Sequence, residues 1–133
     1  MLLSLKSQLC AYCGAHEDQG HLLLRCPRAR RIWRLIGWPQ AACIDSFRDL
    51  WDIHDLALIP YAKVRSGIVT AVLWNIWKYR NDLVFNNVLV PAHVTLRAVA
   101  TDLDLWRYRL RDPAAVTSLL SWVDYFCNIV TLL

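Results

Sequence analysis

The chain has 133 residues, the length of one ordinary domain, and 56% of them are hydrophobic, which excludes a disordered chain. The formal net charge of +4 allows contact with nucleic acid but does not require it. A chain of this length can bury a hydrophobic core without the help of disulfides.

The five cysteines favour a reducing environment. An odd number argues against a closed disulfide framework, and free thiols in such an environment favour metal binding. No secretory signal and no run of about 18 apolar residues is visible, so we expect an intracellular protein, nuclear or cytoplasmic, without a membrane span. Cys43 and Cys127 are isolated on apolar segments, and we expect both to be buried.

The first element along the chain is a cysteine-rich module. Its spacing is Cys-x2-Cys-x7-His-x4-Cys, met by Cys10, Cys13, His21 and Cys26. Two thiolates from a Cys-x-x-Cys turn, with the following histidine and cysteine, can complete a tetrahedral zinc site. That site would have no open position, so Zn²⁺ would be structural. His16 is a rival ligand, and the alternatives to a metal site are a redox motif or cysteines loose in a loop.

About five helices follow, divided by proline, glycine and N-cap residues. The sequence predicts a mainly α fold with a small N-terminal zinc-knuckle-like module ahead of these helices. The helices are expected at 27–36, 46–59, 61–86, 91–112 and 113–132. We divide the chain into a zinc-binding module with a basic helix at 1–36, a helical region with a Trp/Arg-Asn motif at 37–112, and an apolar C-terminal helix at 113–133.

The basic helix carries five arginines in ten residues. They are Arg25, Arg28, Arg30, Arg31 and Arg34, and some of them share a helical face. Arginines beside a zinc knuckle can clamp phosphates, so we expect weak contact with RNA or single-stranded DNA. A solvated helix face without a ligand is the alternative.

The helix at 61–86 carries the stretch "WNIWKYRND". At 3.6 residues per turn, one stripe takes Trp74, Trp77, Asn81 and Phe85, with Arg80 at its border. We expect this stripe to pack inward. A buried guanidinium needs a partner, and Asp102, Asp104 or an aspartate of the second helix could supply one.

Two of these segments resemble a known family. "CAYCGAHEDQGHLLLRCPRARRIW" and "LWNIWKYRNDLVFNN" are similar to the zinc-binding region of reverse transcriptases from plant LINE-type (non-LTR) retrotransposons. The resemblance covers roughly residues 8–88. The first motif is met by Cys10, Cys13, Glu17, His21, Leu22, Leu23, Cys26, Pro27, Ala29 and Trp33, and the second by Trp74, Trp77, Arg80, Asn81 and Phe85.

The resemblance implies origin in the C-terminal part of a retrotransposon polyprotein, with zinc on Cys10, Cys13, His21 and Cys26. It does not imply an enzyme. The polymerase's Tyr-x-Asp-Asp signature and the RNase H carboxylates are missing, the tail after residue 112 diverges from the family, and no nucleophile with a nearby base is visible. We therefore expect no catalytic residues and no small-molecule substrate. A domesticated protein-interaction module, using an exposed Trp-rich or C-terminal apolar surface, is the alternative function.

Overall fold

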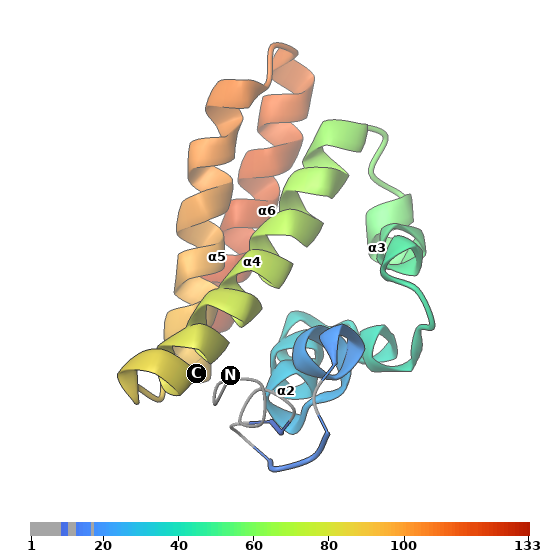
Figure 1. Cartoon of the computed structure of the whole chain (residues 1–133). Helices are drawn as coiled ribbons and strands as arrows, with labels where there is room; N and C mark the ends of the chain where they lie inside the picture. Colours follow the sequence, from blue (N-terminus) through green and yellow to red (C-terminus); the bar gives the residue numbers. More distant parts are fainter. Residues whose placement is uncertain (1–8, 11–12, 17) are drawn as a thin grey trace.

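The computed structural model describes residues 9–10, 13–16 and 18–133. The prediction of a mainly α fold with a cysteine- and histidine-containing module near its N-terminus is confirmed (Figure 1). No strand occurs within the described ranges, where Leu9 and His16 form an isolated antiparallel bridge. The elements are η1 (His21–Arg25), α2 (Pro27–Ile36), η2 (Pro39–Cys43), η3 (Phe47–Asp52), α3 (His54–Ala57), α4 (Ala62–Asn86), α5 (Ala92–Trp106), η4 (Arg107–Arg109) and α6 (Pro113–Leu132).

Helix ends follow the residues that the sequence places there. Pro27 occupies the first turn of α2, where its missing N–H costs nothing, and Gly37 ends the helix in a left-handed conformation with φ of 101°. Asn87 ends α4 in the same region, with φ of 54°. The carboxylate of Asp112 caps α6 by accepting from the N–H of Ala114 at 2.9 Å. These signals explain why α2, α4 and α6 match three of the five expected helices to within one residue, whereas α5 ends at Trp106, before the expected end at 112.

The segment between α2 and α4 departs from the prediction of one helix. It forms a six-residue 3₁₀ helix, η3, and a single α-helical turn, α3. Its buried residues recur every three positions, at Leu50, Ile53, Leu56 and Ile59. Leu50 lies in η3 and Leu56 in α3, so the buried positions run across both elements.

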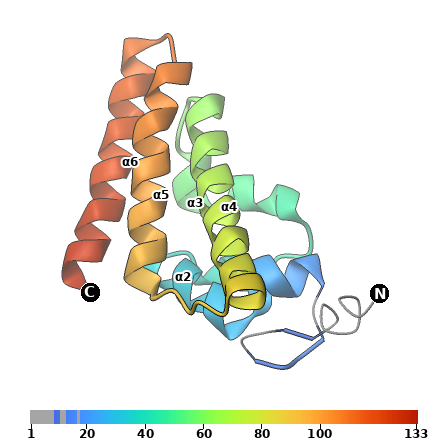
Figure 2. The same ribbon diagram turned by 60° about the vertical axis from the view of Figure 1, so that its left-hand side comes forward.

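Three long helices form the other half of the molecule. Helices α5 and α6 make an antiparallel hairpin, and α4 crosses beside α5 (Figures 1 and 2). The most extensive packing joins α5 to α6, followed by α4 to α5. Leu96, Val99 and Leu103 of α5 and Leu119 and Phe126 of α6 are fully or nearly fully buried between them.

One hydrophobic core joins this three-helix region to α2. Trp38 is fully buried and packs between Trp33, with ring centroids 6.3 Å apart, and Trp122 of α6, at 5.8 Å. The hydroxyl of Tyr125 donates to the backbone carbonyl of Ile36, and partial burial raises the pKa of this phenol above its ordinary value. Helix α6 therefore covers the C-terminal end of α2.

The face that α4 turns inward differs from the predicted stripe. Trp74, Trp77 and Phe85 are 51%, 43% and 62% exposed, so the expectation that they pack inward is wrong. The inward face instead carries small and branched residues. Gly67 lies against the indole of Trp106, where a Cβ atom would come within 2.9 Å of Nε1. Gly67 thus leaves room on α4 for the indole of Trp106, which a larger residue would displace.

Two of the aspartates expected as partners of Arg80 have contacts with other residues. Asp102 accepts from Nδ2 of the buried Asn75 at 2.8 Å, and Asp104 pairs with Arg107, the first residue of η4, at 3.6 Å. Arg80 is half-buried, and its Nη1 donates to Oδ1 of the neighbouring Asn81 at 3.0 Å.

Within the described part of the chain, α6 alone is long and apolar enough to cross a membrane by length and composition. Core helices of soluble proteins often pass the same test, so it does not establish a span. The exposed side of α6 also carries a stripe of polar residues at helical spacing. These are Thr117, Ser121, Asp124, Asn128 and Thr131.

Candidate metal centre

Four side chains from the cysteine-rich module converge on one point. The ligand atoms of Cys10, Cys13, His21 and Cys26 all lie within 4.8 Å of one another. Cys10 Sγ lies 3.4 Å from Cys26 Sγ, and Cys13 Sγ lies 3.4 Å from His21 Nε2. These are the four residues that the sequence spacing predicts, and they could bind a metal ion.

The separations fit the interior of a tetrahedral site. Metal–sulfur bonds of about 2.3 Å and metal–nitrogen bonds of about 2.0 Å place neighbouring ligand atoms about 3.5 to 3.8 Å apart in a tetrahedron. The two pairs at 3.4 Å are slightly tighter than this, and no pair is more than about 1 Å looser. Small side-chain rotations therefore suffice to close four bonds around one ion.

The first ligand pair lies on a tight turn. The N–H of Gly14 donates to the carbonyl of Cys10 at 2.8 Å, and the N–H of Cys10 donates to the carbonyl of Ala15 at 2.7 Å. Gly14 has φ of 76°, a left-handed conformation in which a side chain would be strained. The turn folds the chain back after Cys13 and directs two sulfurs to the same side.

The second ligand pair lies on a helical turn that Asp18 begins. The Asp18 carboxylate accepts from the N–H of His21 at 2.7 Å, and this bond lowers the pKa of Asp18. The N–H of Cys26 then donates to the carbonyl of His21 at 2.7 Å. Sequence reasoning missed Asp18, although an aspartate three residues before a helical histidine is an N-cap signal.

Cys26 lies at the N-cap of α2. The backbone N–H of Arg28 reaches its sulfur and favours the thiolate, but burial next to Cys10 dominates and raises the pKa of Cys26 to about 12. Without a cation at this point, the Cys26 thiol stays protonated at neutral pH. A bound metal ion reverses this balance, because its positive charge stabilises the thiolate. The cysteine thiols therefore release their protons when they bind the ion.

Hydrogen bonds tie the module to the rest of the fold. The indole N–H of Trp33 donates to the carbonyl of Leu23 at 2.8 Å, and Leu24 is buried beside it. Arg28 Nη2 donates to the carbonyl of Val90, in the connection between α4 and α5. These bonds join the cysteine-rich module to α2, and α2 to the connection between α4 and α5.

The remaining histidine and cysteine candidates lie outside the cluster. His16 is exposed and forms the bridge to Leu9, so the rival ligand is not among the four converging residues. Cys43 and Cys127 are exposed free thiols, and the expectation that both are buried is wrong. On α6 the buried positions fall at Leu119 and Phe126, which leaves Cys127 on the outer side.

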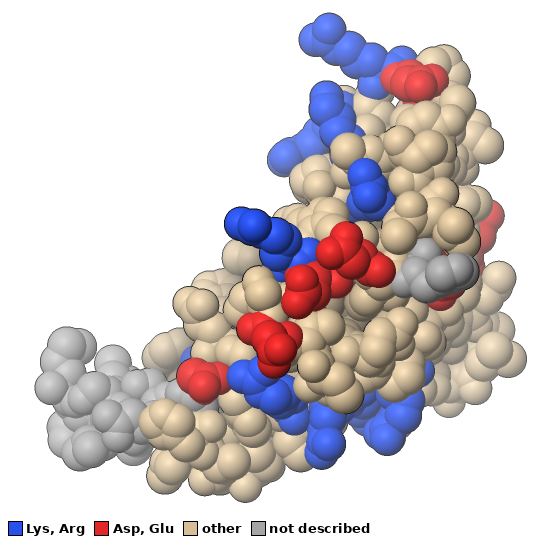
Figure 3. Space-filling model, turned by 90° about the vertical axis from the view of Figure 1, so that its right-hand side faces the viewer, with Lys and Arg blue, Asp and Glu red and all other residues tan. Residues whose placement is uncertain are grey.

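The five arginines of the basic cluster divide into two groups. Arg28 holds Val90, and Arg25 pairs with Asp18 at 3.5 Å, so neither is a simple solvated side chain. The other three, Arg30, Arg31 and Arg34, are exposed on α2. Figure 3 shows basic side chains gathered at the lower edge of one face, where α2 lies in Figure 1, below a band of acidic side chains.

A shallow hollow of about 220 Å³ accompanies the exposed arginines. It lies between α2 and η2, and its lining includes Arg30, Arg34 and Pro39. Two guanidinium groups one helical turn apart beside a hollow suit an anion such as phosphate.

Comparison of the chain with protein-family models, with curated proteins and with solved structures gave no match. Any statement of function therefore rests on the residues and the geometry given above.

Proposed function

We propose that this chain is a non-enzymatic protein that is built around one structural Zn²⁺ ion and makes weak contact with RNA or single-stranded DNA. The observation that carries the proposal is the convergence of three cysteines and one histidine. Thiolate and imidazole ligands in this ratio are typical of structural zinc sites. Four protein ligands leave no position for a substrate or an activated water, which argues for a structural role rather than catalysis.

Metal analysis with a matched pair of histidine variants tests the zinc site. The purified protein should contain about one zinc per chain, and His21→Ala should lose it, whereas His16→Ala should retain it. His16 is the matched control because it is a nearby histidine outside the cluster. Retention of zinc by His21→Ala together with loss by His16→Ala would assign the ligand to the other histidine. Absence of any bound metal would remove the proposal.

We also propose an origin in a LINE-type retrotransposon, with nucleic-acid contact through the exposed arginines of α2. Two sequence motifs, 48 residues apart from Cys26 to Trp74, support the origin. For the contact, a double variant Arg30→Ala/Arg34→Ala should weaken RNA binding. Two lost phosphate contacts should also reduce the slope of log affinity against log salt by about 1.4.

A second double variant provides the control for charge. Arg48→Ala/Arg97→Ala removes the same charge from exposed positions on η3 and α5. Its affinity for RNA should stay within about twofold of the unmodified protein. Equal losses in the two variants would point to non-specific attraction by net charge, and the α2 contact would be abandoned.

A protein-interaction module is the second candidate function. The exposed, mutually stacked Trp74 and Trp77, with ring centroids 5.2 Å apart, favour it because large exposed aromatic residues are typical of interaction sites. Association with a protein through such a surface would depend little on salt. Salt-insensitive self-association that Trp77→Ala abolishes would favour this candidate over nucleic-acid contact.

A further inference from the structure

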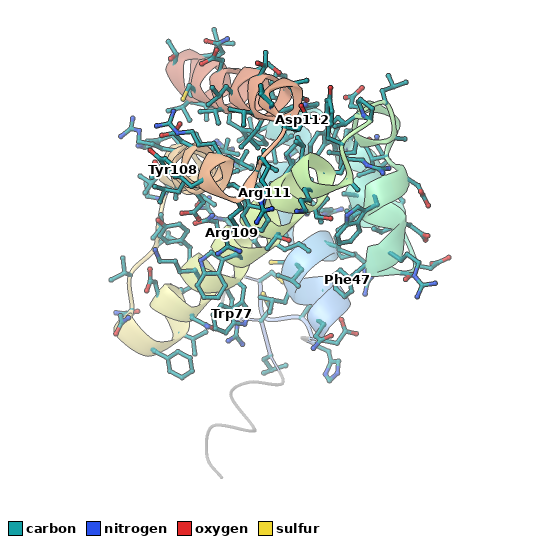
Figure 4. All side chains as sticks on the ribbon, turned by 90° about the horizontal axis from the view of Figure 1, so that it is seen from above. Phe47, Trp77, Tyr108, Arg109, Arg111 and Asp112 are labelled. Atoms are coloured by element: carbon teal, nitrogen blue, oxygen red, sulfur yellow. The ribbon has the colours of Figure 1, made fainter. Side chains whose placement is uncertain are left out.

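A second hollow, lined by none of the metal-binding residues, lies between α4 and the end of α5. It has a volume of about 290 Å³, and the residues that shape it are Trp74 from α4 and Asp102, Leu105, Trp106 and Arg109 from α5 and η4. Figure 4, which looks onto the α5–α6 turn, shows Tyr108, Arg109 and Arg111 grouped at this end of the molecule. The size suits a small flat molecule rather than a folded segment of chain.

Aromatic side chains form two sides of this hollow. The indole of Trp74 is 51% exposed and is held in place by stacking on Trp77, with 30° between the ring planes. On the opposite side, the guanidinium of Arg109 lies 4.6 Å from the ring centroid of Trp106. A planar ligand in contact with Trp74 would cover apolar surface that is otherwise in water.

Charged groups of opposite sign lie at different places in the hollow. Asp102 is half-buried, and one of its oxygens accepts from Nδ2 of the buried Asn75, which fixes the carboxylate. Arg109 is exposed. The hollow thus offers a hydrogen-bond acceptor, an aromatic face and a cation.

We propose that this hollow binds an unpaired nucleobase with an exocyclic amino group, together with its phosphate. The base stacks on Trp74, its amino group donates to Asp102, and Arg109 binds the phosphate. Adenine, cytosine and guanine carry such an amino group, whereas uracil and thymine carry a carbonyl oxygen that the carboxylate repels. This inference deepens the proposed nucleic-acid contact and rests on it for the choice of ligand.

The charges argue against the two simplest protein ligands. A lysine or arginine side chain from a partner would meet the guanidinium of Arg109, which already occupies one aromatic face. A purely apolar side chain would desolvate the carboxylate of Asp102 without supplying a donor to it. A nucleotide offers an amino donor to the carboxylate of Asp102 and a negatively charged phosphate to the guanidinium of Arg109.

Titration of the zinc-loaded protein with AMP, CMP and UMP tests the inference. Indole N–H signals in ¹⁵N NMR spectra report binding, and Trp74→Ala identifies the signal of Trp74. AMP and CMP should shift that signal, with UMP binding at least about fivefold more weakly. Trp74→Ala should weaken AMP binding at least about tenfold, which is the usual order of one lost stacking contact. Unchanged AMP affinity in Trp74→Ala overturns the proposal.

Two further variants separate this site from the contact at α2. Asp102→Asn can still accept from Asn75 but lacks the carboxylate, so it should lose the preference for AMP over UMP. Arg30→Ala/Arg34→Ala should leave AMP binding unchanged while it weakens binding of long RNA. If long RNA binds normally and no mononucleotide does, the inference fails and the proposed function stands. Preferential binding of an arginine-containing peptide would also overturn the inference, in favour of a protein ligand.

Discussion

Two regions of this molecule hold their shape by different means. In the loop that carries the four proposed ligands, the described residues between 9 and 26 bury three side chains, those of Cys10, Leu24 and Cys26. The three-helix region α4–α6 buries an apolar stripe on each helix. The first region thus has little hydrophobic surface to hold it together, whereas the second has enough to pack without other help.

With the proposed metal bound, the chain would combine a metal-dependent segment with a core that packs without metal. In the loop, two of the three main buried side chains are ligands, so the same residues that close the site also fill it. In the three-helix region, polar groups such as Asn75 and Asp102 are exceptions within an apolar interface. Removal of the metal should therefore affect the two regions unequally.

Loss of the metal should give the largest difference between the regions. Binding free energy on the order of 10 kcal/mol is known for small zinc modules, which is enough to order a loop of this kind. We expect Cys26→Ser to lose zinc and hydrogen-exchange protection at residues 18–26, while the amides of α5 and α6 stay protected. Metal analysis and hydrogen exchange measure both effects.

Cys43→Ser is the matched control for this prediction. Cys43 is an exposed free thiol outside the cluster, so its replacement should change neither the zinc content nor the exchange pattern. Loss of protection throughout α5 and α6 in Cys26→Ser would show that the two regions depend on the metal together.

Two tryptophan variants test which side chains belong to the core. Trp33 is fully buried and its indole bonds Leu23, so Trp33→Ala should lower the free energy of unfolding by about 3–5 kcal/mol. Trp77 is 43% exposed, so Trp77→Ala should cost less than about 1 kcal/mol. Denaturant unfolding measures both values. Similar costs for the two would mean that α4 packs with its tryptophans inward.

Asn75 tests the polar contact within the three-helix interface. Asn75→Ala removes the donor to Asp102 and leaves that half-buried carboxylate without it, which should cost about 1–3 kcal/mol. Asn86→Ala, at an exposed position on the same helix, should stay within about 0.5 kcal/mol. Thermal unfolding of Asn75→Ala and Asn86→Ala compares the two costs. Equal melting temperatures for the two variants would contradict the prediction.

The smallest expected effect concerns Asp18. Its carboxylate accepts from the N–H of His21, so Asp18→Ala should weaken zinc affinity without abolishing binding. An asparagine side chain keeps an oxygen at the N-cap, and Asp18→Asn should therefore retain affinity close to that of the unmodified protein. Competition with a chromogenic chelator measures the zinc affinities of the unmodified protein and the two variants. A loss in Asp18→Asn as large as that in Asp18→Ala would assign the effect to charge rather than to the cap.

The sequence predicted the features that local residue types determine. Prolines, glycines and asparagines placed the ends of α2, α4 and α6, because each stops or starts a helix through its own backbone preference. The four converging residues were also predicted, since ligand spacing in a Cys-x-x-Cys module is set by the chain over a short distance.

Features that depend on distant partners were predicted poorly. Apolar residues occur all round α4, so periodicity could not decide that Gly67 is buried against α5 while Trp74 stays half exposed. The same is true of Arg28, whose carbonyl acceptor lies 62 residues further along the chain. For the segment 46–59, local periodicity predicted one α-helix, and the structure has η3 and α3 in its place.

The contact between α6 and the first helix has a consequence for synthesis on the ribosome. The last fully buried aromatic residue, Phe126, follows Cys26 by 100 residues, which translation covers in about 5–20 s. During that interval the cysteine loop has emerged, while Trp38 still lacks its cover from Trp122. Capture of the proposed zinc ion would therefore come first, and a nascent chain stalled before α6 would carry a loaded metal loop and an exposed indole for chaperones to bind.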